Sequence, residues 1–75
     1  MSWGHYSVAM RYRAEVYRIK TDELVADLGS WESRLSAQLA CLAYQRMILA
    51  WNEPRPGCWV AEAAACSYRV TAIIE

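Results

Sequence analysis

The segment from Ser30 to Asn52 constrains the fold most strongly, because its pattern predicts one long helix in a chain of only 75 residues. At about 100° per residue, one row of its large apolar side chains falls within about 80° of arc, the width of a helix face that packs on a core. This leucine row consists of Trp31, Leu35, Leu39, Leu42 and Leu49. We therefore expect the leucine row to pack on a sheet.

A second apolar row runs along the same predicted helix, more than about 100° from the first. It repeats at i, i+4, i+7, i+11 and i+14 and consists of Ala37, Cys41, Tyr44, Ile48 and Trp51. If a curled sheet wraps a wide arc of the helix, both rows belong to the core. Otherwise the second row, and above all Tyr44, Ile48 and Trp51, is open to a partner or to a second copy of the chain.

Alternating apolar and polar residues predict strands on both sides of this helix. Such alternation runs from Tyr6 to Ala14, from Leu24 to Leu28 and from Tyr68 to Ile74, and it is the period of a half-buried strand. The segment from Cys58 to Ala65 is ambiguous, because Trp and Val favour a strand whereas a run of alanines favours a helix. We interpret it as a strand.

The segments between these elements contain residues that favour turns. The alternation changes phase near Glu15 to Tyr17, which indicates a bulge, and the stretch Lys20-Thr21-Asp22-Glu23 has turn chemistry. Ser30 is a suitable N-cap for the helix. The two prolines between Asn52 and Gly57 cannot continue a helix, so we expect a surface loop there.

The predicted order is therefore β-β-α-β-β in a single domain covering residues 1–75. Such an order favours an α+β fold, an antiparallel sheet with one long helix packed across one face. At this length the domain lies near the lower limit for independent folding. Its 56% content of hydrophobic residues argues against disorder.

Charge and hydropathy exclude several classes of partner. Eight basic and eight acidic residues cancel, so no global field attracts nucleic acid or an anionic membrane. The longest uncharged stretch, Leu35 to Gln45, is far shorter than the ~20 residues that a membrane span needs. The N-terminal residues lack the pattern of a secretory signal, and three cysteines without a Cys-x-x-Cys pair suit a reducing compartment. We expect a cytoplasmic location.

The residue constellations that catalysis and metal binding need are missing from the sequence. His5 is the only histidine, and the three glycines stand alone, so no phosphate-binding loop is present. No Ser or Cys nucleophile lies in a known catalytic pattern. We therefore predict no catalytic residue, no bound metal and no cofactor, and we expect that the protein is not an enzyme.

Three arginines form the most conspicuous polar group of the predicted sheet. Arg11, Arg13 and Arg69 would project from its solvent face, where they could contact phosphates or an acidic protein. RNA-binding sheets combine basic residues with exposed aromatic rings on one face. Here Tyr6 and Tyr12 have the opposite parity from Arg11 and Arg13, which makes nucleic acid the weaker candidate.

In size, and in its hairpin, single long helix and returning strands, the chain resembles the small phage-encoded inhibitors of bacterial defence systems, anti-CRISPR proteins among them. The resemblance covers the whole chain but includes no sequence motif, so it assigns no functional residue. Many of those proteins are more acidic than this one. The resemblance implies a non-catalytic inhibitor that binds an effector complex and occludes a surface on it.

Two functions remain open at this point. The first is a protein-binding inhibitor with a protein partner, a bacterial defence complex in the case of an anti-CRISPR. The second is a small nucleic-acid-binding or regulatory domain that reads through the arginines, as a homodimer joined by the second row of the helix. For partner binding the sequence points to Tyr44, Ile48, Trp51, Arg11, Arg13 and Arg69.

Overall fold

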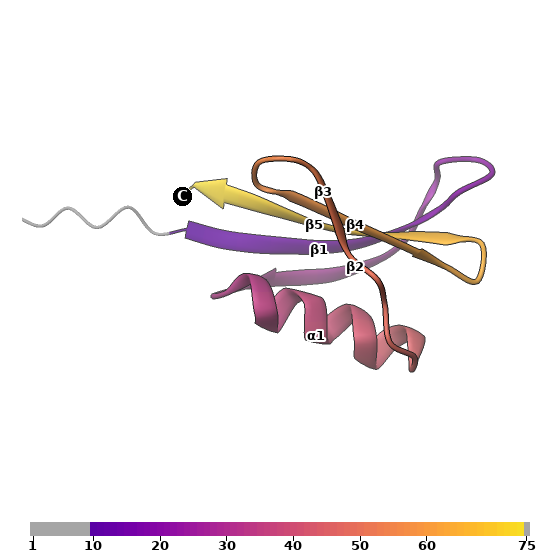
Figure 1. Cartoon of the computed structure of the whole chain (residues 1–75), viewed down its shortest axis with the longest axis horizontal. Coiled ribbons are helices and arrows are strands. Elements are labelled where there is room, and N and C mark those ends of the chain that lie inside the picture. Colours follow the sequence, from indigo (N-terminus) through magenta and orange to yellow (C-terminus); the bar gives the residue numbers. More distant parts are fainter. Residues whose placement is uncertain (1–9, 75) are drawn as a thin grey trace, which may run out of the picture.

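The computed structural model describes residues 10–74, which form a five-stranded antiparallel sheet with one helix on one face (Figure 1). The elements along the chain are β1 (Met10–Arg18), β2 (Leu24–Trp31), α1 (Arg34–Gln45), β3 (Asn52–Arg55), β4 (Cys58–Ala63) and β5 (Cys66–Ile74). In the sheet the strands lie in the order β2-β1-β5-β4-β3. The predicted α+β class is confirmed, but the predicted element order lacks one strand.

The missing strand is β3, which lies where the sequence predicted a loop. It is a short edge strand that pairs Asn52 with Val60 and Arg55 with Cys58, with an irregular register between them. A proline is tolerated there because an edge strand has backbone groups that need no partner in the sheet. The prediction of a loop was therefore wrong for Asn52–Arg55. The ambiguous segment after it is a strand, as predicted, over Cys58–Ala63.

The centre of the sheet is the pair β1 and β5, which is regular from Met10 opposite Ile74 to Arg18 opposite Cys66. The even-numbered residues of both strands point towards the helix, and four of them are almost completely buried. These four are Ala14, Val16, Tyr68 and Val70. The predicted alternation is thus confirmed for the described part of β1 and for β5, whereas the predicted strand residues before Met10 lie outside the described residues.

The predicted irregularity near Glu15 to Tyr17 is present, but in the neighbouring strand. Between β1 and β2 the register shifts after Ala14 and again after Val16. Because β1 stays in regular register with β5, the extra residues belong to β2, at Leu28 and Val25. Bulges of this kind bend an edge strand and increase its twist.

The helix is much shorter than predicted and ends well before Asn52. Ser30 and Trp31 continue β2, where Trp31 pairs with Tyr12, so the predicted N-cap at Ser30 was wrong. The N-cap is Ser33, whose hydroxyl oxygen accepts a hydrogen bond from the backbone N–H of Ser36 at 3.1 Å. At the other end Arg46 adopts a left-handed conformation (φ 65°) and donates its backbone N–H to the carbonyl of Leu42.

The face of α1 that meets the sheet is the opposite of the expected one. Ala37 and Cys41 are fully buried against the sheet, whereas the side chains of Leu35 and Leu39 are 60% and 50% exposed. The prediction that the leucine row packs on the sheet was therefore wrong for these residues. Small residues let a helix lie close to the strands, and the large side chain of Tyr68, from the sheet, occupies the core beneath it.

Beyond α1 the chain has no regular secondary structure until β3, at the far edge of the sheet (Figure 1). Leu49 is buried and Trp51 is partly buried against the core. Ile48, which precedes Leu49, and Ala50, which lies between Leu49 and Trp51, are exposed. Burial in this segment thus alternates from one residue to the next and does not follow the 3.6-residue period of a helix. Within residues 10–74, no helix has the length and apolar character that crossing a membrane requires.

Candidate protein-binding surface

An apolar groove lies between α1 and the segment that connects it to β3. Its volume is about 220 Å³. The lining residues are Leu35, Gln38, Leu39, Leu42, Ile48, Leu49 and Trp51. Gln38 is the one polar residue among them, so an occupant of this groove would meet mostly hydrocarbon and one indole ring. We call this the helix surface below.

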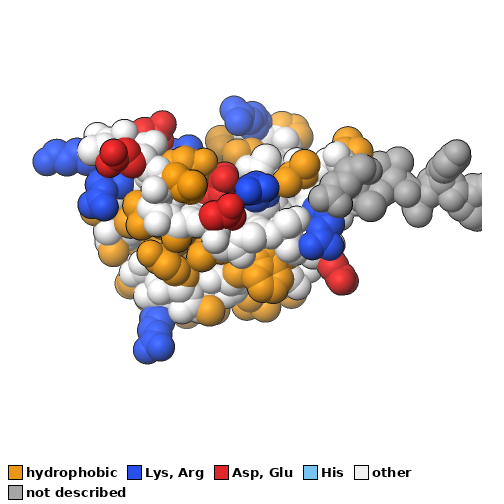
Figure 2. Space-filling view, turned by 180° about the vertical axis from the view of Figure 1, so that it is seen from behind, with side chains coloured by type: hydrophobic (Ala, Val, Ile, Leu, Met, Phe, Trp, Pro, Cys, Tyr) orange, Lys and Arg blue, Asp and Glu red, His pale blue; other side chains and the backbone are white. Residues whose placement is uncertain are grey.

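Large side chains on the helix surface are open to solvent. Ile48 is 90% exposed, and Leu35 and Leu39 are at least half exposed. Apolar side chains accordingly line the lower side of the molecule in Figure 2, where α1 lies. Single exposed apolar residues are common, but a contiguous apolar patch on a small protein marks a site of interaction.

Charged residues are present only at the ends of α1. From Leu35 to Gln45 no residue is charged, while Glu32 and Arg46, at the two ends, are both exposed. Arg34, at the start of the helix, stacks over the ring of Trp59 at 5.5 Å from its centroid. The solvent side of a helix normally carries charged side chains, so α1 resembles a helix that packs against protein on two sides.

The second row expected for partner binding does not form one continuous row, because the helix ends at Gln45. Ile48 and Trp51 line the groove together with the leucines. Tyr44 lies elsewhere, with its ring 6.3 Å from that of Tyr68, and is 47% exposed. The structure therefore brings together two of these three residues.

The three predicted arginines share the sheet face that points away from α1, as expected from their positions in β1 and β5. Arg11 donates from Nε to the hydroxyl of Ser30 (3.1 Å) and from Nη2 to its carbonyl (2.9 Å). Arg13 forms ion pairs with Glu15 (3.3 Å) and Asp27 (3.0 Å). Their hydrogen-bonding capacity is thus partly used within the sheet.

Arg69 is held in the same way. Its Nη2 lies 2.8 Å from a carboxylate oxygen of Asp22, and its guanidinium stacks on the ring of Tyr17 at 4.0 Å. Basic and acidic side chains accordingly lie next to one another on the surface shown in Figure 2. Because the nearby carboxylates offset the positive charge, this face has little excess charge with which to attract phosphates.

The paired groups Arg13 and Asp27 on this face both have shifted pKa values. The backbone N–H of Gly29 donates to the carboxylate of Asp27 at 3.0 Å, and this hydrogen bond, with the nearby charge of Arg13, lowers the pKa of Asp27. Asp27 in turn raises the pKa of Arg13. Both shifts keep the pair ionised, which is the behaviour of a local ion pair and not of a catalytic acid.

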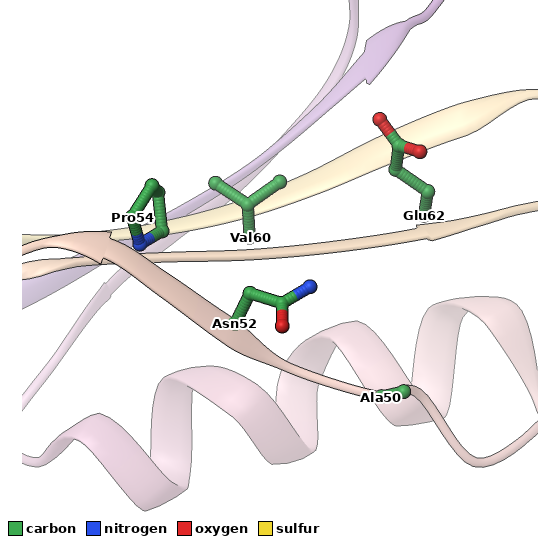
Figure 3. Close-up of a pocket in the computed structure, with 5 residues that line it drawn as sticks. All are labelled: Ala50, Asn52, Pro54, Val60 and Glu62. Carbon is green, nitrogen blue, oxygen red and sulfur yellow. The ribbon is translucent and has the colours of Figure 1, made fainter.

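A second hollow, beside β3, has a volume of about 470 Å³ and is open to solvent. Its lining residues are Ala50, Asn52, Pro54, Val60 and Glu62. Figure 3 shows that the carboxylate of Glu62 and the amide of Asn52 do not point towards one another. With one carboxylate and one amide that do not converge, this hollow offers no pair of groups for acid and base catalysis.

Metal-ligating residues do not cluster in the part of the chain that the structure describes. Residues 10–74 contain no group of three His, Cys, Asp or Glu side chains placed to hold an ion. The three cysteines are separate, free thiols, and burial raises the pKa of Cys41 to about 11. A buried thiol with so high a pKa is a poor nucleophile.

The sequence reading did not assign Leu35, Leu39 and Leu42 to a candidate site, since it placed them in the core. The signal that identifies them is their spacing. They follow one another at intervals of four and three residues, which places them on one side of the helix. Comparison with models of protein families, with curated proteins and with solved structures finds no match for this chain.

Proposed function

We propose that this protein is a non-catalytic inhibitor that binds another protein through the helix surface and occludes a surface on a larger complex. An anti-CRISPR protein that blocks a CRISPR effector is one such inhibitor, and the resemblance in size and architecture points to that class. The proposal requires no cofactor and no reacting group in the chain.

One observation carries this proposal. The helix packs on the sheet through Ala37 and Cys41 and leaves Leu35 and Leu39 on its outer side, next to the 90% exposed Ile48. Burying a Leu or Ile side chain contributes on the order of 1.5–3 kcal/mol. A partner that covers this surface would bury several such side chains, and their summed contributions would favour binding and oppose the free-energy cost of association.

The alternative, a nucleic-acid-binding domain that reads through the arginines, has less support. Arg13 and Arg69 are paired with Asp27 and Asp22, and Glu15 lies beside Arg13. Binding a phosphate there would require the breaking of ion pairs or the approach of an anion to carboxylates. Base stacking needs exposed aromatic rings, and the ring of Tyr17 on this face is covered by the guanidinium of Arg69.

A capture experiment with matched variants tests the proposal. Leu39 and Leu24 are equally exposed, at 50% and 52%, but Leu24 lies in β2, away from the helix surface. The wild-type protein, Leu39→Glu and Leu24→Glu are immobilised and incubated with lysate of bacteria that contain a CRISPR effector complex. We expect the wild type and Leu24→Glu to retain the complex and Leu39→Glu to lose it.

Retention of the complex by all three proteins would contradict the assigned surface. Retention by none of them, together with a mobility shift of short RNA or DNA at moderate salt, would favour the nucleic-acid alternative. In cells that carry the effector, the wild type and Leu24→Glu should protect a targeted plasmid, and Leu39→Glu should not.

A further inference from the structure

We draw no further inference here: the strongest candidate, the apolar groove between α1 and the segment that connects it to β3, belongs to the surface already described, and nothing within the described residues 10–74 shows what covers it.

Discussion

At the scale of single residues, Cys41 shows how closely the helix lies on the sheet. Its side chain is fully buried between α1 and the strands, and burial raises its pKa to about 11. Cys58 and Cys66 are only partly buried. We therefore expect a thiol reagent at pH 8 to modify Cys58 and Cys66 in the native protein well before Cys41, as followed by mass spectrometry of tryptic peptides.

The same thiol makes stability depend on alkaline pH. The folded-state pKa of Cys41 is about 11, against an ordinary value of 9.0, so between these values the unfolded chain loses a proton that the folded chain keeps. The contribution of Cys41 to the free energy of unfolding should therefore be constant below about pH 9 and fall by about 2–3 kcal/mol as the pH rises to 11. In Cys41→Ala this part of the decrease should be absent; an equal decrease in both proteins would contradict the assignment.

At the scale of elements, the turn between β4 and β5 contains a local conflict between sequence and backbone. Ala64 and Ala65 have φ values of 52° and 65°, which is the left-handed conformation that a two-residue hairpin turn requires and that alanine disfavours. Asn at the first of these positions and Gly at the second adopt it more readily. We expect the double substitution Ala64→Asn, Ala65→Gly to raise the free energy of unfolding by about 1 kcal/mol.

Chemical denaturation measures this change, and a matched control lies in the adjoining strand. Ala61→Gly, at a buried position with extended backbone, should lower stability, since Gly costs conformational entropy and removes a buried methyl group. If the turn substitution also destabilised the protein, the left-handed conformation assigned to this turn would be wrong.

At the scale of the whole molecule, the strands were easier to predict than the helix. Strands β1 and β5 have one face buried under α1 and one face towards solvent, so their alternation directly reflects the structure. The edge strand β3 was not predicted, because its proline, Pro54, is compatible with a loop and with an edge strand alike.

The extent of the helix was hidden by a coincidence of spacing. Leu49 and Trp51 continue the helical rows of the sequence, although they lie outside the helix, between α1 and β3. Ser30 and Ser33 are both suitable N-caps, and pairing of Trp31 with Tyr12 in the sheet decides between them. The sequence pattern contains no information on that long-range contact.

The predicted orientation of the helix was wrong because it rested on a general rule that this helix does not follow. The largest apolar residues of a helix usually face the core, and that rule placed the leucine row on the sheet. Here Ala37 and Cys41 take that position. The structure places Ile48 and Trp51, two of the residues predicted for partner binding, in one apolar groove with Leu35, Leu39 and Leu42, which the sequence pattern had assigned to the core.

The orientation of α1 is the central claim, and the free energies of unfolding of two glutamine variants test it most directly. In Leu39→Gln the free energy of unfolding should fall by about 1 kcal/mol or less, since Leu39 is half exposed. The measurement is made at a protein concentration low enough to exclude association. Ala37→Gln should lose about 2–4 kcal/mol, because the side chain would have to enter a filled core. A loss of about 3 kcal/mol in Leu39→Gln, with Ala37→Gln tolerated, would contradict the claim.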